Sequence, residues 1–129
     1  MAHILVIEDN PANMQLMVYL LQAFGHEPVE VETGEQGLEL ARQNVFDLIL
    51  CDIQLPRLDG YGVAKTLKAH PTLKRTPLVA VTALAMVGDR EKVLAAGFDG
   101  YIAKPIVPQT FVSQMEAFLP SQGNDPRRT

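Results

Sequence analysis

Residues 46–61 read FDLILCDIQLPRLDGY, and the fold prediction rests on the pattern in this stretch. A nearly unbroken apolar run ends at Asp52, and turn-forming residues such as Pro56 and Gly60 follow it. Such runs are typical of strands that are buried on both faces of a parallel sheet. A carboxylate after the run then lies at the carboxyl end of the strand, where open α/β sheets bind ligands.

Similar short runs recur along the chain with helix-length segments between them. The predicted strands are residues 3–7 (HILVI), 27–31 (EPVEV), 46–51 (FDLILC), 77–81 (PLVAV) and 98–102 (FDGYI). The predicted helices are residues 11–24, 35–44, 60–70, 84–96 and 108–119. This alternation predicts an α/β fold, a doubly wound (βα)5 three-layer sandwich around a five-stranded parallel sheet. Pro28 and the Asp99-Gly100 pair place the second and fifth strands at the edges.

Length and composition bound the class of protein. The chain has 129 residues, 47% of them apolar, and a formal net charge of −4, which suits one folded domain and excludes intrinsic disorder. The longest apolar runs are too short to span a membrane. The only Lys/Arg cluster in the sequence is Arg127-Arg128 at its end, so we expect no direct nucleic acid binding. The single cysteine favours a cytoplasmic protein. We expect a domain over residues 1–120 and a disordered tail over residues 121–129.

Polar residues follow four of the predicted strands at their carboxyl ends. They are Glu8 and Asp9 after the first strand, Asp52 after the third, Thr82 after the fourth and Lys104 after the fifth. Three neighbouring carboxylates need a cation, and hard oxygen ligands suit Mg²⁺. An aspartate can form an acyl phosphate, while an ammonium and a hydroxyl can hold the phosphoryl oxygens. These residue types are the ones that phosphoryl transfer to Asp52 requires.

Each of these residues also has an ordinary structural interpretation. Glu8 and Asp9 precede Asn10-Pro11, so Asp9 or Asn10 can simply cap a helix. Taken singly, Thr82 fits a strand and Lys104 a solvated loop. Asp52 is harder to explain in this way, because a charge after a buried strand needs a partner.

The chain resembles the receiver domains of two-component response regulators over residues 3–119. LVIEDN matches the acidic pair, LILCDIQLPRLDGY the phosphorylated aspartate with its loop, VAVTALA the switch threonine, and YIAKP the switch aromatic and the lysine–proline pair. The sequences of these motifs are similar to those of single-domain cell-cycle regulators and of hybrid-kinase receivers. The resemblance implies the flavodoxin-like strand order 2-1-3-4-5.

The resemblance also assigns roles at the site. It implies that Asp52 accepts a phosphoryl group from a phosphohistidine and binds Mg²⁺, or Mn²⁺ in its place. Asp9 would bind the metal directly, Glu8 through water and Gln54 through its backbone carbonyl.

Four further residues take roles from the same resemblance. Lys104 would contact the phosphoryl group, and the Lys104–Pro105 peptide bond would be cis. Thr82 would move toward the phosphate, and Tyr101 would turn inward with it. The chain would then act as a signalling switch rather than as an enzyme with turnover on a substrate.

The first predicted helix offers a candidate docking surface. Leu16, Leu20 and Phe24 share one stripe that we assign to the core, and three apolar residues then face outward: Met14, Val18 and Tyr19. Exposed apolar clusters indicate interfaces. We expect this one to dock a histidine kinase or a histidine phosphotransfer protein.

Other predictions concern partners and competing functions. The switch would act on a downstream protein target, as a monomer or as a phosphorylation-dependent dimer. We expect a stand-alone receiver, as the start at Met1 favours, and the alternative is a receiver cut from a hybrid kinase or larger regulator. A flavodoxin-like cofactor-binding protein is the alternative from a different class. It would need a Ser/Thr/Gly-rich phosphate-binding loop after the first strand, where this chain has EDNPAN instead.

His3, His26 and His70 are scattered and are predicted to be surface or turn residues.

Overall fold

The computed structural model of the chain describes residues 2–83 and 88–119. Five parallel strands form one sheet in the order β2-β1-β3-β4-β5. Their bounds are β1 His3–Ile7, β2 Glu27–Val31, β3 Leu48–Asp52, β4 Leu78–Thr82 and β5 Gly100–Ala103. The predicted fold class and strand order are confirmed.

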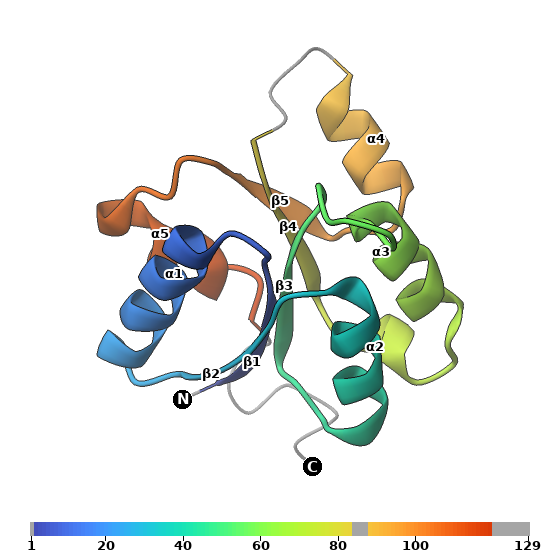
Figure 1. The fold of residues 1–129 in the computed structure, drawn as a ribbon, viewed down its shortest axis with the longest axis horizontal. Coiled ribbons are helices and arrows are strands. Elements are labelled where there is room, and N and C mark those ends of the chain that lie inside the picture. Colours follow the sequence, from blue (N-terminus) through green and yellow to red (C-terminus); the bar gives the residue numbers. More distant parts are fainter. Residues whose placement is uncertain (1, 84–87, 120–129) are drawn as a thin grey trace.

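Helices cover both faces of this sheet (Figure 1). The helices are α1 Pro11–Ala23, α2 Gly34–Gln43, α3 Gly60–Ala69, α4 Asp89–Ala95 and α5 Pro108–Glu116, with a short 3-10 turn η1 at Leu73–Arg75. The α1 and α5 helices lie on one face, and α2, α3 and α4 lie on the other. The result is the three-layer sandwich that the alternation of elements predicts.

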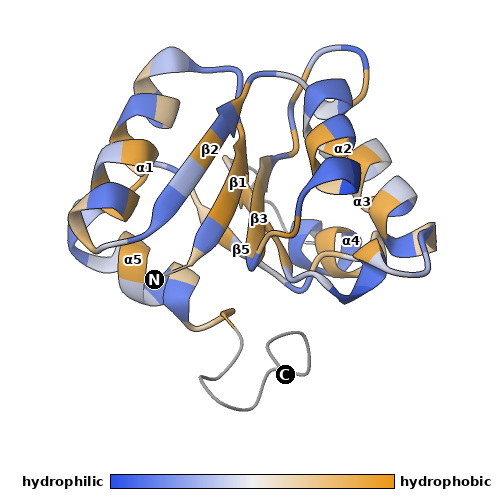
Figure 2. Ribbon diagram, turned by 90° about the horizontal axis from the view of Figure 1, so that it is seen from below, coloured by the Kyte–Doolittle hydropathy of each residue, from blue (hydrophilic) through white to orange (hydrophobic). Residues whose placement is uncertain are grey.

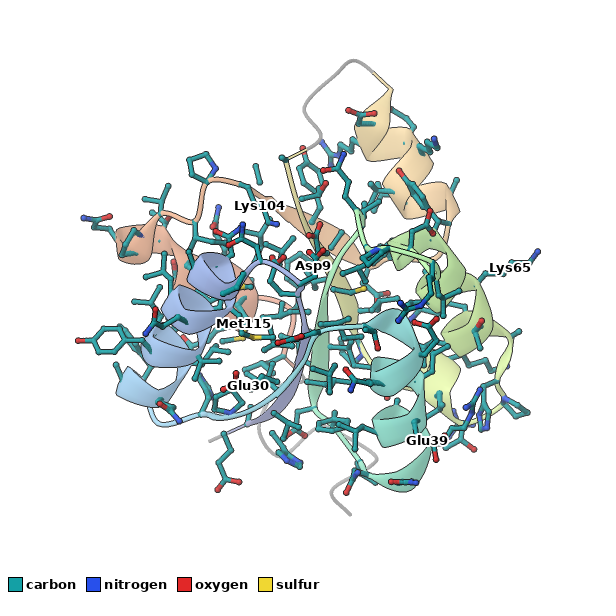
Figure 3. The ribbon with its side chains drawn as sticks, in the orientation of Figure 1. Asp9, Glu30, Glu39, Lys65, Lys104 and Met115 are labelled. Atoms are coloured by element: carbon teal, nitrogen blue, oxygen red, sulfur yellow. The ribbon has the colours of Figure 1, made fainter. Side chains whose placement is uncertain are left out.

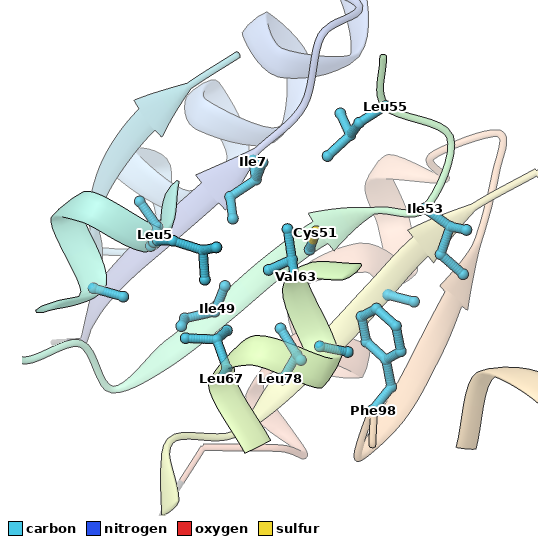
Figure 4. Close-up of a cluster of buried hydrophobic side chains, with 14 of the residues drawn as sticks. Leu5, Ile7, Ile49, Cys51, Ile53, Leu55, Val63, Leu67, Leu78 and Phe98 are labelled. Carbon is cyan, nitrogen blue, oxygen red and sulfur yellow. The ribbon is translucent and has the colours of Figure 1, made fainter. Parts of the chain in front are cut away.

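The core has one apolar cluster on each face of the sheet. Leu5, Ile7, Ile49 and Cys51 point toward α2 and α3, where they meet residues such as Val63 (Figure 4). Alternate residues of the same strands point toward α1 and α5. All residues of β3 and β4 are buried, whereas β2 exposes two glutamates, as suits an edge strand. Figure 2 shows hydrophilic segments in β2 and a hydrophobic β3.

The predicted boundaries need small corrections. The last three strands begin two, one and two residues later than the sequence pattern placed them, because Phe46, Asp47 and their equivalents belong to the turns that enter the sheet. The predicted fourth helix covered residues 84–96, of which residues 84–87 lie outside the described part. The tail predicted at 121–129 also lies outside it.

The predicted core stripe of α1 is wrong at Phe24, which is 61% exposed. Leu20 is buried and Leu16 packs against the core, as predicted, and Met14, Met17 and Leu21 are buried as well. The helix ends at Ala23, and Gly25 with φ 84° turns the chain toward β2. Phe24 therefore no longer follows the helical spacing that aligned it with Leu20.

His26 is buried, so its prediction as a surface or turn residue is wrong. Its Nδ1 accepts a hydrogen bond from the Ala2 backbone N–H at 3.1 Å, and its Nε2 lies 2.8 Å from Glu116 Oε2. Because Nδ1 is an acceptor here, Nε2 carries the proton in the neutral ring and donates to Glu116. The ring thus connects the starts of β1 and β2 with the end of α5.

Candidate functional site

The carboxyl ends of β1, β3, β4 and β5 bring the predicted polar residues together. Glu8, Asp52 and Thr82 are buried, at 1%, 5% and 1% exposure. Lys104, which follows β5, reaches both buried carboxylates, and the Lys104–Pro105 peptide bond is cis, as predicted. Asp9 is exposed beside them, and Figure 3 shows Asp9 and Lys104 beyond the strand ends.

Lys104 lies between the two buried carboxylates. Its Nζ donates to Asp52 Oδ2 at 3.1 Å and forms an ion pair with Glu8 Oε1 at 2.9 Å. The second contact lacks the angle of a hydrogen bond, so Glu8 Oε1 is buried with a counter-charge but without a hydrogen-bond donor among the described residues. One cation therefore faces two carboxylates at this site.

Backbone amides hold the other oxygen of each carboxylate. Asn10 N–H donates to Glu8 Oε2 at 3.1 Å, and Gln54 N–H donates to Asp52 Oδ1 at 3.1 Å. These contacts fix the orientation of both side chains before any ligand binds. They also place Gln54 directly beside Asp52.

Burial and the neighbouring charges shift the pKa of Glu8. This pKa is raised to about 7: burial is the largest cause, the contact with Lys104 opposes the rise, and the nearby Asp52 carboxylate adds to it. Burial alone would lower the pKa of Lys104, but its contacts with Glu8 and Asp52 outweigh burial and raise that pKa. The site thus favours an additional positive charge.

Asp9 completes a group of three carboxylates. Glu8, Asp9 and Asp52 each offer an oxygen, and these oxygens lie within 4.8 Å of one another. Asn10, rather than Asp9, caps α1, since its side chain accepts a hydrogen bond from Asn13 N–H at 3.0 Å. The capping interpretation therefore applies to Asn10 and leaves Asp9 available to a ligand.

The loop after β3 packs tightly against Asp52. Gly60 begins α3, and a Cβ atom there would lie 2.6 Å from the Asp52 carbonyl oxygen and from Ile53 Cα. Asp59 caps the helix by accepting from Gly62 N–H at 3.0 Å. The glycine lets α3 approach the end of β3 closely, which supports the position of Gln54.

Two predicted switch residues lie on the neighbouring strands. Thr82 ends β4 and is buried next to the site, whereas Tyr101 on β5 is 38% exposed. Tyr101 borders a hollow of about 540 Å³ between α4 and α5, which Arg90 and Phe118 also line. The tyrosine side chain is therefore partly exposed to solvent at this hollow.

The predicted docking residues on α1 separate into two groups. Val18 is half-buried and Tyr19 is 68% exposed, but Met14 is only 6% exposed. The prediction that Met14 faces outward is wrong, because Met14 belongs to the apolar cluster beneath the helix.

The sequence analysis assigned no role to Glu30 and Glu32, which face α1 across a groove. The period-two alternation of EPVEV was the available signal that these glutamates share a face.

The family model described as "Response regulator receiver domain" matches residues 4–116. The chain belongs to the response regulator receiver family. The polar-differentiation response regulator DivK of Brucella ovis is 41% identical to this receiver over 116 residues, which are 90% of this chain and 94% of DivK.

Solved receivers have the same fold as this receiver. The receiver domain of a sensor histidine kinase from Pseudomonas aeruginosa, described with a magnesium ion coordinated in its active-site cleft, is 35% identical with a TM-score of 0.83. The match covers 91% of this chain and 96% of that one. The chemotaxis response regulator CheY4 of Vibrio cholerae is 26% identical with a TM-score of 0.87, over 92% and 99% of the two chains. The receiver interpretation therefore holds over the flavodoxin-like alternative.

The receiver is a signalling module of the two-component type, and the acidic group described above is compatible with a bound metal. Within the described residues, no helix has both the length and the apolar character needed to cross a bilayer.

Proposed function

We propose that this receiver accepts a phosphoryl group on Asp52 from the phosphohistidine of a histidine kinase or histidine phosphotransfer protein. One observation carries the proposal: Asp52 is buried, yet it lies beside Glu8 and Asp9, and among the described residues only Lys104 balances the group. A structural aspartate would be matched by its partners, whereas this one lies in a site with too much negative charge.

The donor set fits Mg²⁺, with Mn²⁺ as a substitute. Three carboxylates offer hard oxygen ligands, and a partly exposed site lets a metal keep several waters. We assign Asp9 and Asp52 as direct ligands, Gln54 through its backbone carbonyl and Glu8 through water. When bound, the metal supplies positive charge for the incoming phosphoryl oxygens.

The residues of the chain then have distinct tasks in the transfer. An Asp52 carboxylate oxygen attacks phosphorus, the P–N bond of the phosphohistidine breaks, and its electron pair leaves with the imidazole. Lys104, which holds Asp52 Oδ2 at 3.1 Å, is placed to neutralise a phosphoryl oxygen. The Thr82 hydroxyl donates a hydrogen bond to another.

Phosphorylation would switch the surface around Tyr101. Movement of Thr82 toward the phosphoryl group leaves space beside β5, and Tyr101 turns inward to fill it. This changes the hollow between α4 and α5, where we place the contact with a downstream protein target or with a second phosphorylated copy. The unphosphorylated receiver would be a monomer.

Val18 and Tyr19 are proposed to contact the phosphodonor protein. Both are apolar, both lie on α1 next to the acidic group, and Tyr19 is largely exposed. We further propose that the receiver unit spans residues 1–120 and works in the cytoplasm, where kinases of this class present their phosphohistidine.

Intact-mass spectrometry after incubation with acetyl phosphate tests the acceptor assignment. The wild type should gain one phosphoryl group only when Mg²⁺ is present, and Asp52→Asn should gain none. Glu39→Gln on the exposed face of α2 is the matched control and should label like the wild type. An adduct that persists in Asp52→Asn would refute the assignment.

A further inference from the structure

A groove of about 630 Å³ separates α1 from the edge strand β2. We call it the α1–β2 groove. Val18 and Tyr19 line its helix side, and Glu30 and Glu32 line its strand side. Glu8 and Asp9 lie at the end of the groove that is nearest the carboxyl ends of the strands. Figure 3 shows Glu30 on β2 and Asp9 beyond the end of β1.

The strand side of the groove follows from the register of β2. Glu30 pairs with Val6, and Val6 packs in the cluster beneath α1 and α5. Paired residues of neighbouring strands point to the same face, so Glu30 points toward α1, and Glu32 follows two residues later. Both carboxylates are exposed.

The charge of the groove is entirely negative. Four of its lining residues are carboxylates, and none of the described residues that line it is a lysine or arginine. Neither Glu30 nor Glu32 forms an ion pair with any other described residue. The sequence is consistent with this, because residues 1–41 contain seven aspartates and glutamates but no lysine or arginine. The described part of the chain therefore offers these carboxylates no cation, and a binding partner can supply one.

The groove is continuous with the phosphorylation site. Val31 pairs with Ile7, and the Glu8 N–H donates to the Val31 carbonyl, so Glu32 lies level with the acidic group that surrounds Asp52. Glu30 lies two residues, or about 7 Å, farther down the strand. A protein that places a phosphohistidine at Asp52 and covers α1 would lie directly over both glutamates.

We propose that the α1–β2 groove receives a lysine or arginine side chain of the phosphodonor protein, and that Glu30 and Glu32 are specificity-determining residues for transfer from that protein. The inference rests on the proposed function, since it needs a protein donor that docks at Asp52. Charges at the edge of an interface speed association and make it sensitive to salt, and like charges reject wrong partners. The glutamates would therefore select donors with a basic residue at this position.

Exposed charge on an edge strand also discourages strand pairing, which is the simpler explanation for the glutamates of β2. Glu27 separates the two explanations. It is exposed on the same edge strand, but it pairs with His3 and does not line the groove. Glu27→Gln is therefore the matched control for Glu30→Gln and Glu32→Gln.

The test uses one autophosphorylated histidine kinase, chosen from a purified panel as the fastest donor to the wild-type chain. At low ionic strength, the Glu30→Gln/Glu32→Gln variant should lose about tenfold in kcat/KM, mainly through KM, and the charge-reversed Glu30→Lys/Glu32→Lys variant should lose more. Salt should slow transfer to the wild type more steeply than transfer to the double glutamine variant. Glu27→Gln should stay within about twofold of the wild type.

Labelling by acetyl phosphate separates this inference from the proposed function. All these variants should accept a phosphoryl group from acetyl phosphate at the wild-type rate, since Asp52 and its neighbours are unchanged. Transfer from the kinase that stays within twofold in the double glutamine variant would overturn the inference and leave the proposed function standing. Equal losses in Glu27→Gln and in the groove variants would also overturn it. No labelling of the wild type by acetyl phosphate would instead refute the proposed function.

Discussion

Each end of the sheet has a small group of ionisable side chains around a buried member, but the two groups are balanced differently. At the amino end, His26 meets one donor, the Ala2 N–H, and one acceptor, Glu116, so that each ring nitrogen has a partner. At the carboxyl end, Glu8 and Asp52 share the single cation of Lys104, with Asp9 close by. The matched group can hold the fold together without a ligand, whereas the unmatched group awaits additional positive charge.

Removing the Lys104 ammonium from the carboxyl end should have the largest effect on the free energy of unfolding. Without metal at pH 8, Lys104→Met should lower the free energy of unfolding by about 3 kcal/mol, because two buried carboxylates then lack a counter-charge. Chemical denaturation in EDTA measures this. Arg42→Met is a useful control, since its ion pair with Glu39 is exposed and should contribute less than about 1 kcal/mol. Equal losses in the two variants would contradict the special role of the carboxyl end.

The raised pKa of Glu8 should make the free energy of unfolding depend on pH. Its folded pKa of about 7 exceeds the value of 4.5 for the free group, so the folded chain retains a proton that the unfolded chain releases between these values. The stability contribution of Glu8 therefore falls as pH rises from about 4.5 to 7, by about 2–3 kcal/mol. Glu8→Gln should match the wild type near pH 4.5 and become more stable than it by this amount above pH 7, in metal-free denaturation curves. Parallel curves for the two proteins would contradict the raised pKa.

The matched end should behave as a structural element only. His26→Ala should cost about 2 kcal/mol of unfolding free energy, because the Ala2 N–H loses its acceptor and the ring leaves a cavity. Glu116→Gln keeps an acceptor for His26 Nε2 and should change stability by less than about 0.5 kcal/mol. Both variants should label with acetyl phosphate at the wild-type rate. Slower labelling would mean that the two ends are coupled.

The smallest expected effect concerns docking on α1. Val18→Glu/Tyr19→Glu should slow transfer from a protein donor about tenfold, or about 1.4 kcal/mol, without slowing acetyl phosphate. Stopped-flow or quenched transfer from the autophosphorylated kinase measures this. Met14→Glu is unsuitable, because Met14 is buried and a charge there would disrupt the core. An unchanged rate from the protein donor would remove Val18 and Tyr19 from the interface.

The sequence predicts the carboxyl end of the sheet much better than the amino end. Asp52 and Thr82 each end a recognisable strand and Lys104 directly follows one, so the topology alone brings them together. His26 meets Glu116 across 90 residues, and no local pattern around Gly25-His26-Glu27 signals that contact. The bond depends on how α5 packs, which the sequence pattern does not specify.

The error in α1 has a different cause. Residues 16–21 of this helix are almost all apolar, so several helical stripes fit the sequence equally well. The choice of Leu16, Leu20 and Phe24 over the stripe of Met14 and Met17 depended on including Phe24, which lies beyond the helix. A helix that is apolar around most of its circumference shows its buried face only once it is packed against the sheet.

The measurement that tests the imbalance most directly is the unfolding free energy of Asp52→Asn in EDTA at pH 8. This substitution leaves Glu8 and Lys104 as a balanced pair, so the variant should be more stable than the wild type by about 1–2 kcal/mol while it loses labelling by acetyl phosphate. An Asp52→Asn variant that is less stable than the wild type under these conditions would mean that Asp52 is matched by its partners, and would contradict the account.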